Sequence, residues 1–374
     1  MLRRLLTKRC AGAAIVWFAC TGTPRGGAEI AQPERSHVTI RGVYGGVPVQ
    51  ILERGRTLDD YGINAIWLGS GAVTNERLAL LRGAGVKVFA EFNTMHEAGY
   101  LREHPDAAPV GVDGEVSPPP DGWQGICPTH PGYRRYRMEA FRELLEKFPL
   151  DGVWLDYHHS HASWEQAAPK MPDTCFCERC VAQYVRDNGT LLPSPSSALP
   201  QVLLTRYREK WLRWRAGVFT DWVREFRAIL DKTRPGILLG TFHNPWSDSD
   251  YNGARYEKLA IDLKAQARYI DVFSIMPYHA RFGHAADPAW ISRQTAWLGT
   301  HLGISGKAGE RHKIWPIVQL SDWGETVPAS QVKEILDHGT RLPATGVMVF
   351  AWGSLHKSWD KVEEMGRFYR SIQK

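Results

Sequence analysis

The sequence predicts a (β/α)8 TIM barrel, a closed ring of parallel strands surrounded by helices. Eight short runs rich in Val, Ile and Phe recur along the chain, and stretches with the period of an amphipathic helix separate most of them. Short runs of this kind are typical of strands buried on both faces, and helical crossovers require parallel pairing. At 374 residues the chain is long enough for one large barrel.

The expected strands and helices alternate in the order that this fold requires. The strands are expected at 38–44, 64–69, 86–92, 152–157, 237–243, 270–276, 314–320 and 346–352. The clearest helices are expected at 75–83, 133–148, 203–232, 287–302 and 328–341. Thr74 suits the N-cap of the first helix, and Pro328 suits the first turn of the last.

A doubly wound open sheet is the alternative fold, but no glycine-rich phosphate loop leads from the first strand into an obvious helix. The segment 162–200 is too long for an ordinary connection between a strand and a helix. We therefore expect it to form an elaborated loop after the fourth strand, over the top of the barrel. The domain organisation that follows is a single catalytic barrel over 36–374.

Residues 1–28 have the layout of a secretory signal peptide. A basic start is followed by a short apolar stretch and then by small residues. We expect export to the periplasm or the cell exterior; the pair Arg3-Arg4 suggests the twin-arginine route, and Cys20 is a candidate for a lipid anchor. A cytosolic protein with an irregular N-terminus is the alternative.

Charge and hydropathy exclude two classes of partner. The formal net charge is +6, but five of the basic residues lie within the first 28, where no acidic residue occurs. Without this segment the net charge is +1, and no stripe of Lys and Arg predicts a nucleic-acid surface. No later segment is long and apolar enough to span a membrane, and the sequence does not indicate an oligomeric state.

Polar and aromatic side chains follow the predicted strands where a barrel places its active site, at the carboxyl ends. Those that we single out are Glu91, Asn93, Asp156, His158, His159, His243, Asn244, Tyr278, His279, Gln319, Asp322, Trp352 and Ser354. Asp156 shares one face of its strand with Trp154. Because a carboxylate among apolar helices is costly, we expect Asp156 to face the barrel mouth rather than serve in a loop network.

Carboxylates among aromatic side chains suit sugar chemistry, because glycosidic bond cleavage uses a pair of carboxyl groups. Candidate partners of Asp156 are Asp322 and Glu91 at strand ends, and the loop residues Glu165, Asp248, Asp250 and Glu325. Tryptophan faces pack against sugar rings, while His and Asn bind hydroxyl groups. The candidate platforms are Trp67, Trp154, Trp246, Trp323 and Trp352, and the other substrate-binding candidates are His158, His159, His243, Asn244, Tyr278, His279 and Gln319.

Four cysteines form a separate candidate site. Cys175, Cys177 and Cys180 follow one another closely, and Cys127 lies upstream. Four thiols can hold a structural Zn²⁺ ion in a closed tetrahedral site. Two disulfide bonds are the alternative, which export would favour, although direct pairing of Cys175 with Cys177 would be strained.

Three segments together resemble the catalytic barrel of family 42 β-galactosidases and related family-10-like glycosyl hydrolases. They are I-C-P-T-H-P-G-Y-R-R-Y, D-G-V-W-L-D-Y and C-F-C-E-R-C, and the ending G-V-M-V-F-A-W-G-S-L also fits. The resemblance implies a structural Zn²⁺ on Cys127, Cys175, Cys177 and Cys180, and a catalytic carboxylate at Asp156. The β-galactosidases carry Asn-Glu after the fourth strand where this chain has Asp156-Tyr157, as in barrels that use aspartate as the nucleophile.

The leading hypothesis is therefore a glycoside hydrolase that acts on a poly- or oligosaccharide with Asp156 as nucleophile or charge stabiliser. A non-catalytic carbohydrate-binding barrel is the first alternative. A metal-dependent polysaccharide deacetylase that uses His158, His159 or His161 with Asp156 is the second. A second carboxyl group within about 5–10 Å of Asp156 would favour the hydrolase.

Overall fold

The computed structural model describes residues 37–117, 125–192 and 198–373, and all of them belong to one compact unit. The expected signal peptide, with Arg3, Arg4 and Cys20, lies outside the described residues. Within the described part of the chain, no helix combines the length and the apolar character needed to cross a membrane.

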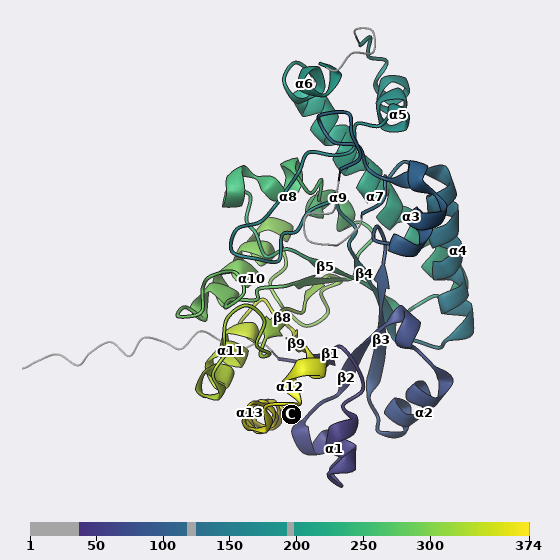
Figure 1. The fold of residues 1–374 in the computed structure, drawn as a ribbon. Coiled ribbons are helices and arrows are strands. Elements are labelled where there is room, and N and C mark those ends of the chain that lie inside the picture. Colours follow the sequence, from purple (N-terminus) through teal and green to yellow (C-terminus); the bar gives the residue numbers. More distant parts are fainter. Residues whose placement is uncertain (1–36, 118–124, 193–197, 374) are drawn as a thin grey trace, which may run out of the picture. The chain divides into compact units, whose positions relative to one another are not determined.

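The strands form one parallel sheet, as predicted (Figure 1). They are β1 (Ile40–Tyr44), β2 (Ala65–Gly69), β3 (Lys87–Asn93), β4 (Gly152–Asp156), β5 (Leu238–His243), β6 (Val272–Ile275), β7 (Lys313–Ile314), β8 (Ile317–Gln319) and β9 (Gly346–Phe350). Their order in the sheet is β7-β6-β5-β4-β3-β2-β1-β9-β8. The (β/α)8 barrel class is confirmed.

The ring closes through an interruption in the expected seventh strand. The run 314–320 is divided into β7, which pairs with β6, and β8, which pairs with β9. The two halves are separated by Trp315 and Pro316, and proline has no N–H to contribute to a strand ladder. The Trp315 N–H still donates to the Phe273 carbonyl at 3.0 Å, and the Pro316 carbonyl accepts from the Met348 N–H at 3.0 Å. The backbone therefore remains bonded to both neighbours across the break.

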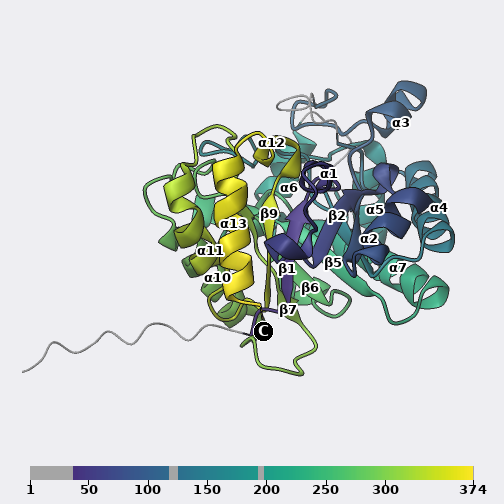
Figure 2. The same cartoon turned by 90° about the horizontal axis from the view of Figure 1, so that it is seen from below.

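Helices follow the strands; most of them surround the ring (Figure 2), and two, Glu178–Asn188 and Leu199–Leu204, lie away from the strands (Figure 1). They are α1 (Val49–Glu53), α2 (Asn75–Gly83), α3 (Ala98–Glu103), α4 (Pro131–Lys147), α5 (Glu178–Asn188), α6 (Leu199–Leu204), α7 (Arg208–Thr233), α8 (Ala254–Glu257), α9 (Leu263–Gln266), α10 (Ala289–Leu302), α11 (Val332–Gly339), α12 (Trp352–Leu355) and α13 (Trp359–Ser371). The hydroxyl of Thr74 caps α2 by accepting from the Arg77 N–H at 3.3 Å. Pro328 lies just before the 3-10 turn Ala329–Gln331 that leads into α11.

Three helical details differ from the expectation. The helix expected at 203–232 is two helices, since α6 ends at Leu204 and α7 begins at Arg208. A short helix, α1, follows the first strand, where none was expected. The C-terminal helix α13 was also not anticipated, although it buries Val362, Met365 and Phe368 at helical spacing.

Four aromatic side chains fill the inside of the ring: Trp67, Phe89, Trp154 and Trp315. Every pair among them is in contact, with ring centroids 4.5–6.3 Å apart. Gly240 makes room for them, because a Cβ at that position would lie 2.2 Å from the Trp154 ring. The barrel is thus a packed core, and open space is left only at its rim.

We predict that Gly240→Ala destabilises the fold by about 1–3 kcal/mol, because the added methyl group overpacks this interior. Urea denaturation measures the difference. Gly71→Ala is the matched control, since a Cβ at Gly71 meets nothing within 4 Å. Equal unfolding midpoints for the two variants would contradict the described packing.

Candidate active site

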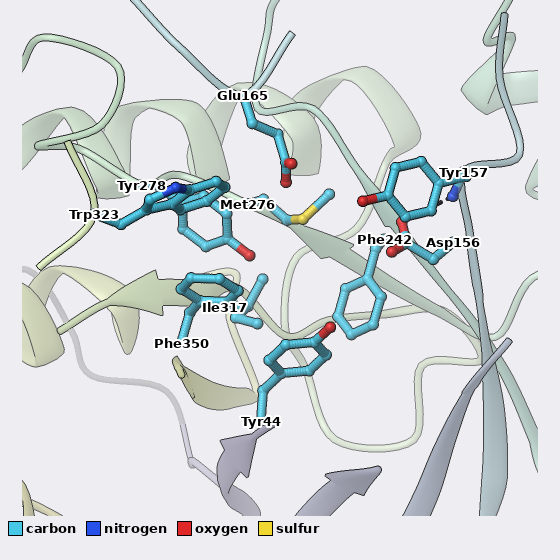
Figure 3. Close-up of a pocket in the computed structure, with 10 residues that line it drawn as sticks. All are labelled: Tyr44, Asp156, Tyr157, Glu165, Phe242, Met276, Tyr278, Ile317, Trp323 and Phe350. Carbon is cyan, nitrogen blue, oxygen red and sulfur yellow. Dashed lines mark hydrogen bonds between the residues drawn. The ribbon is translucent and has the colours of Figure 1, made fainter. Parts of the chain in front are cut away.

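A hollow of about 170 Å³ lies at the carboxyl ends of the strands (Figure 3). Strands on different sides of the ring contribute to it, so it lies over the filled interior. Its lining consists of Tyr44, Asp156, Tyr157, Glu165, Phe242, Met276, Tyr278, Ile317, Trp323 and Phe350. Asp156, Tyr278 and Trp323 are sequence-predicted site residues, and Glu165 was predicted as a loop residue able to reach the site.

Asp156 ends β4 and presents its carboxyl group to this hollow (Figure 3). The next residue, Tyr157, has a φ of 49°, which is unusual for a residue with a bulky side chain. In this conformation the Tyr157 N–H donates to Asp156 Oδ1 at 2.8 Å. The Asp156 carbonyl accepts from both the N–H and the hydroxyl of Thr94, at 2.9 and 2.8 Å. The backbone on both sides of the carboxyl group is therefore fixed.

The surroundings of Asp156 keep its proton bound. Burial raises its pKa well above the usual value for aspartate, and the charges of Glu91 and Glu165 and a hydrogen bond with Glu91 raise it further. The bond from the Tyr157 N–H acts in the opposite direction but is a smaller effect. Two like charges this close cannot both ionise easily. Asp156 can therefore serve as a proton donor at a pH where an ordinary aspartate is ionised.

Glu91 is not among the residues that line the hollow, but it contacts two of them, Tyr44 and Asp156. Its Oε2 accepts a hydrogen bond from the Tyr44 hydroxyl at 2.6 Å. Burial and the two neighbouring carboxylates, Glu91 and Asp156, raise the pKa of Tyr44 well above its ordinary value, so its hydroxyl stays a donor. Glu91 thus sits between a tyrosine donor and the carboxyl group of Asp156.

Glu165 belongs to the excursion after β4, and its carboxyl group points into the hollow (Figure 3). Ser163 and Lys170 close a small hairpin around it through two reciprocal N–H to carbonyl bonds of 2.9 Å. The Arg281 Nε donates to the Glu165 carbonyl at 2.6 Å. The preceding residue, Trp164, is buried and donates from Nε1 to His159 Nε2 at 3.0 Å. A long loop therefore holds this carboxyl group in a defined place.

Aromatic rings form the wall opposite Asp156 (Figure 3). The Trp323 ring lies 5.1 Å from Phe350 and 5.8 Å from Tyr278, between centroids. Phe350 also stacks on Tyr44, with centroids 5.5 Å apart and planes 19° apart. Such flat faces can pack against the C–H faces of a sugar ring.

Four of the five candidate tryptophans are in the core, and only Trp323 reaches the hollow. Trp67 and Trp154 fill the barrel interior, and Trp246 packs against Trp164 with centroids 6.0 Å apart. Trp352 is buried and donates from Nε1 to Gln50 Oε1 at 2.8 Å. The alternation of side chains along a strand predicts which of them point into the barrel. It does not show whether an inward tryptophan lies in the filled interior or at the rim, where a ligand could reach it.

The other candidate carboxylates face away from the hollow. Asp322 pairs with Lys361, with Oδ1 2.7 Å from Nζ, and accepts from the Val327 N–H at 2.9 Å. Asp248 forms an ion pair with Arg255, and its Oδ2 lies 3.4 Å from Nδ1 of His301. Asp250 accepts from the N–H and the hydroxyl of Ser247, and Glu325 is exposed.

The histidines expected to bind substrate or metal are buried, and their ring nitrogens form hydrogen bonds within the protein. Both ring nitrogens of His159 are engaged, by the Ser160 carbonyl and by Trp164, and both nitrogens of His161 by Thr174 and the Ile126 carbonyl. Burial lowers the pKa of each to about 4, so both are neutral at neutral pH. His158 bonds to Thr241 Oγ1 at 2.9 Å. The three are arranged as structural side chains rather than as ligands of a catalytic metal.

His243, Asn244, His279 and Gln319 are also buried and are not among the lining residues. The His243 Nδ1 bonds to the Asn244 carbonyl at 2.8 Å. Gln319 accepts from the Arg281 N–H at 3.0 Å and donates to the Ser321 carbonyl at 3.1 Å, which fixes the loops beside Trp323. Sequence reasoning missed Tyr44 and Phe350 in the lining, although each ends an apolar run and so met the rule that identified Asp156.

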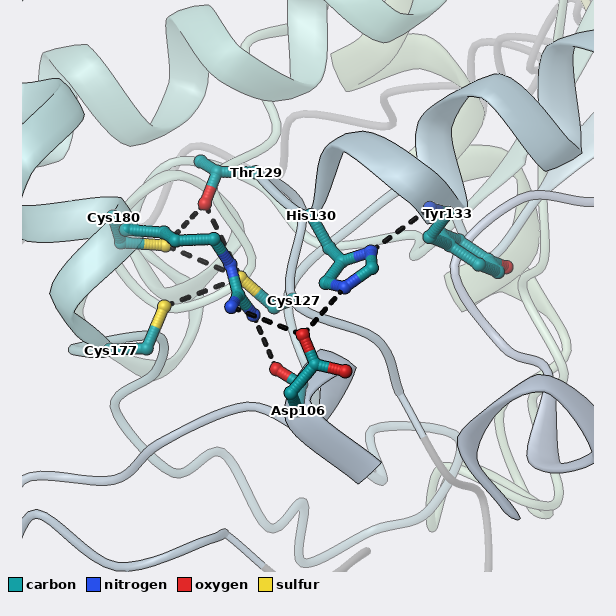
Figure 4. A network of polar contacts seen from close by, with 8 residues as sticks. Asp106, Cys127, Thr129, His130, Tyr133, Cys177 and Cys180 are labelled. Carbon is teal, nitrogen blue, oxygen red and sulfur yellow. Dashed lines mark hydrogen bonds and ion pairs between the residues drawn. The ribbon is translucent and has the colours of Figure 1, made fainter. Parts of the chain in front are cut away.

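The four cysteines come together in a second place, as the sequence predicted. The sulfur atoms of Cys127, Cys175, Cys177 and Cys180 all lie within 4.8 Å of one another, and all four thiols are free. Cys127 Sγ is 3.5 Å from Cys177 Sγ and 3.6 Å from Cys180 Sγ (Figure 4). A disulfide requires about 2.05 Å, whereas a tetrahedron of sulfur ligands at about 2.3 Å from a metal spaces them by about 3.8 Å. The donor set and its spacing therefore fit a metal ion.

Hydrogen bonds surround these thiols. The Val110 N–H donates to Cys175 Sγ at 3.3 Å, and the Thr129 hydroxyl contacts Cys180 Sγ at 3.1 Å. His130 bridges the Cys127 loop to Asp106, with Nε2 3.0 Å from Oδ2, and its Nδ1 accepts from the Tyr133 N–H at the start of α4 (Figure 4). Supporting bonds of this kind orient the ligands of metal sites.

We predict that Asp156→Asn stabilises the fold, and does so more at pH 7 than at pH 4. The raised pKa means that the folded chain keeps a proton which the unfolded chain loses near pH 3.9, so wild-type stability falls as the pH rises above that value, by about 1.4 kcal/mol for each pKa unit. Asparagine does not ionise, so the variant does not lose stability in this way as the pH rises. Urea denaturation at both pH values tests this.

Asp322→Asn should behave in the opposite way. Although partial burial raises the pKa of Asp322, its bonds to Lys361 and the Val327 N–H outweigh this and leave the pKa below its usual value. Its contribution to stability is therefore present at pH 7 and lost as the pH falls. The same sign for both variants would contradict the environments described.

No protein-family model matches the sequence, and neither does any curated protein. Solved structures do match. The glycoside hydrolase domain of PgaB (BpsB) from Bordetella bronchiseptica has a TM-score of 0.65 at 15% identity, over 88% of this chain and 98% of that one. The catalytic domain of β-amylase from Paenibacillus polymyxa has a TM-score of 0.61 at 11% identity, over 91% and 100%.

A β-galactosidase from the psychrophilic Marinomonas ef1 has a TM-score of 0.62 at 13% identity, over 88% of this chain and 59% of that one. At identities this low the likeness is one of fold. The chain has the barrel fold found in these glycoside hydrolases, and its chemistry has to be argued from its own residues.

Proposed function

We propose that the protein is a glycoside hydrolase that cleaves glycosidic bonds of a poly- or oligosaccharide in the hollow at the barrel rim. One observation carries the proposal: the carboxyl groups of Asp156, at the end of β4, and Glu165, in the excursion that follows, face one hollow with an aromatic wall. The glycoside hydrolase folds among the structural neighbours agree with it.

We assign the general acid to Asp156, because its pKa is raised and it can hold a proton for the leaving oxygen. Glu165 then serves as the nucleophile or as the base for water. This reverses the role expected for Asp156 from the sequence, since an aspartate that keeps its proton is a poor nucleophile. Glu91 and Tyr44 support the acid by holding it beside a second carboxyl group.

We further propose that the cysteines hold a structural Zn²⁺ ion. Cys127, Cys175, Cys177 and Cys180 would supply four sulfur ligands, which leaves no open position for water, so the ion would stabilise the excursion and take no part in the reaction. Export is also part of this proposal and rests on the composition of residues 1–28.

Asp156→Asn and Glu165→Gln should each lower kcat by about 10²-fold or more while the protein stays folded, because each removes one member of the pair. Hydrolysis of a polysaccharide panel by the purified chain identifies the substrate, and circular dichroism monitors the fold. Asp322→Asn is the control and should retain activity, since that carboxylate pairs with Lys361 outside the hollow.

A chain that binds a glycan but never cleaves it would support the non-catalytic alternative instead. Unchanged hydrolysis by Asp156→Asn would refute the assignment of the acid.

Cys177→Ser should abolish bound zinc and lower the melting temperature, because three sulfur ligands no longer close the site. Metal content by mass spectrometry and thermal unfolding are the measurements. Wild-type protein that contains no metal and is equally stable with and without a chelator would contradict the proposed zinc site.

A further inference from the structure

We propose that His161 is a positioning residue that couples the four-thiol cluster to Glu165. The state of the thiols would then determine how firmly that carboxyl group is held at the hollow, although the cluster itself takes no part in the chemistry. The inference deepens the proposed function, on which it rests for the role of Glu165, but the coupling can be measured without substrate.

His161 joins the two segments that carry the cysteines. Its Nε2–H donates to the carbonyl of Ile126, the residue before Cys127, at 2.9 Å. Its Nδ1 accepts from the hydroxyl of Thr174, the residue before Cys175, at 2.7 Å. A carbonyl can only accept, so the proton of the neutral ring lies on Nε2. One imidazole therefore bonds to both chain segments next to the sulfur atoms.

Packing gives a second, independent observation. A Cβ on Gly125 would lie only 1.7 Å from Cδ2 of His161, so the ring rests directly on the backbone that leads into Cys127. Only glycine allows this approach. Small cavities of about 10 and 20 Å³ lie beside the ring: Cys175 and Cys180 line the first, and Tyr157, which also lines the hollow, lines the second.

The link continues along the chain to Glu165, four residues further on. Ser160 Oγ lies 3.3 Å from Thr174 Oγ1 and accepts from Arg215 Nη2 at 3.0 Å. The segment 158–165 is attached next to the cysteines through His161 and Ser160. It is also attached to β5 through His158, which bonds to Thr241, and to the loop after β6 through the bond from Arg281 to the Glu165 carbonyl. Loss of the attachment at His161 would remove the hold nearest the cysteines and leave Glu165 with the bonds to the barrel alone.

Hydrogen exchange of the full-length protein, followed by mass spectrometry, tests the coupling. We compare zinc-loaded and chelator-treated wild type with zinc-loaded His161→Leu and His161→Gln. Peptides from 158–170 should exchange about tenfold faster after chelation and in His161→Leu, as expected for the loss of a buried hydrogen bond, while the strands stay protected. His161→Gln should lie between, because its amide can still donate to the Ile126 carbonyl.

His312→Gln is the matched control. His312 also bonds to a carbonyl, that of Ile270 at 2.9 Å, but it lies next to β7 and far along the chain from the cysteines. It should leave exchange in 158–170 unchanged. Unchanged protection of this segment after zinc removal, or in zinc-loaded His161→Leu, overturns the proposal.

If His161→Leu does not fold, Gly125→Ala tests the same coupling. The added methyl group displaces the imidazole without removing it, and it should raise exchange in 158–170 to a similar extent; no local change overturns the coupling. If the wild type cleaves no glycan, the proposed function fails, but the exchange result stands by itself. If it does cleave one, the basic limb of kcat/KM, where the general acid Asp156 loses its proton, should move to lower pH in His161→Leu, because Glu165 helps to raise the pKa of Asp156; an unmoved limb counts against the coupling.

Discussion

The aromatic packing inside the strand ring is the constraint on which the rest of this structure depends. Trp67, Phe89, Trp154 and Trp315 contact one another and leave no channel through the barrel. Trp315 also occupies the break between β7 and β8, so the same cluster fills the core at the point where the ring closes. Because the interior is full, a ligand can enter only at the rim, where the parallel strands end together.

At that rim three carboxyl groups, those of Asp156, Glu91 and Glu165, lie near one another, and burial makes the ionised form of Asp156 unfavourable. Asp156 responds by retaining its proton, and Glu91 and Tyr44 surround it with a second carboxyl group and a donor. This environment is characteristic of functional sites, where pKa values are moved by burial and like charges. The other carboxyl group of the proposed pair, Glu165, lies in the excursion after β4, which also carries His161 and its bond to the Ile126 carbonyl beside Cys127.

The fold and the cysteine cluster could be predicted because both depend on the spacing of residues that are close in the sequence. Strand periodicity located every strand of the ring, and C-x-C-x-x-C placed three thiols within reach of one another. The carboxyl partner could not be chosen from sequence, because Asp322 follows a strand end whereas Glu165 is one of several loop residues able to reach the site. Only packing shows that Lys361 pairs with Asp322 and that Arg281 bonds to the loop of Glu165. Sequence also does not show hydrogen-bond partners. The histidines after β4 were therefore predicted as ligands, although backbone carbonyls and hydroxyl groups bond to their ring nitrogens.

The central claim is that Asp156 holds a proton because it is buried and because Glu91 and Glu165 lie beside it. A titration of ¹³C-labelled aspartate carboxyl groups by NMR tests this most directly, with Asp156 assigned by its absence from the spectrum of an asparagine variant. The account predicts a pKa well above the usual aspartate value, which falls when either Glu91 or Glu165 is replaced by glutamine. An ordinary pKa for Asp156, or one indifferent to both glutamates, would contradict it.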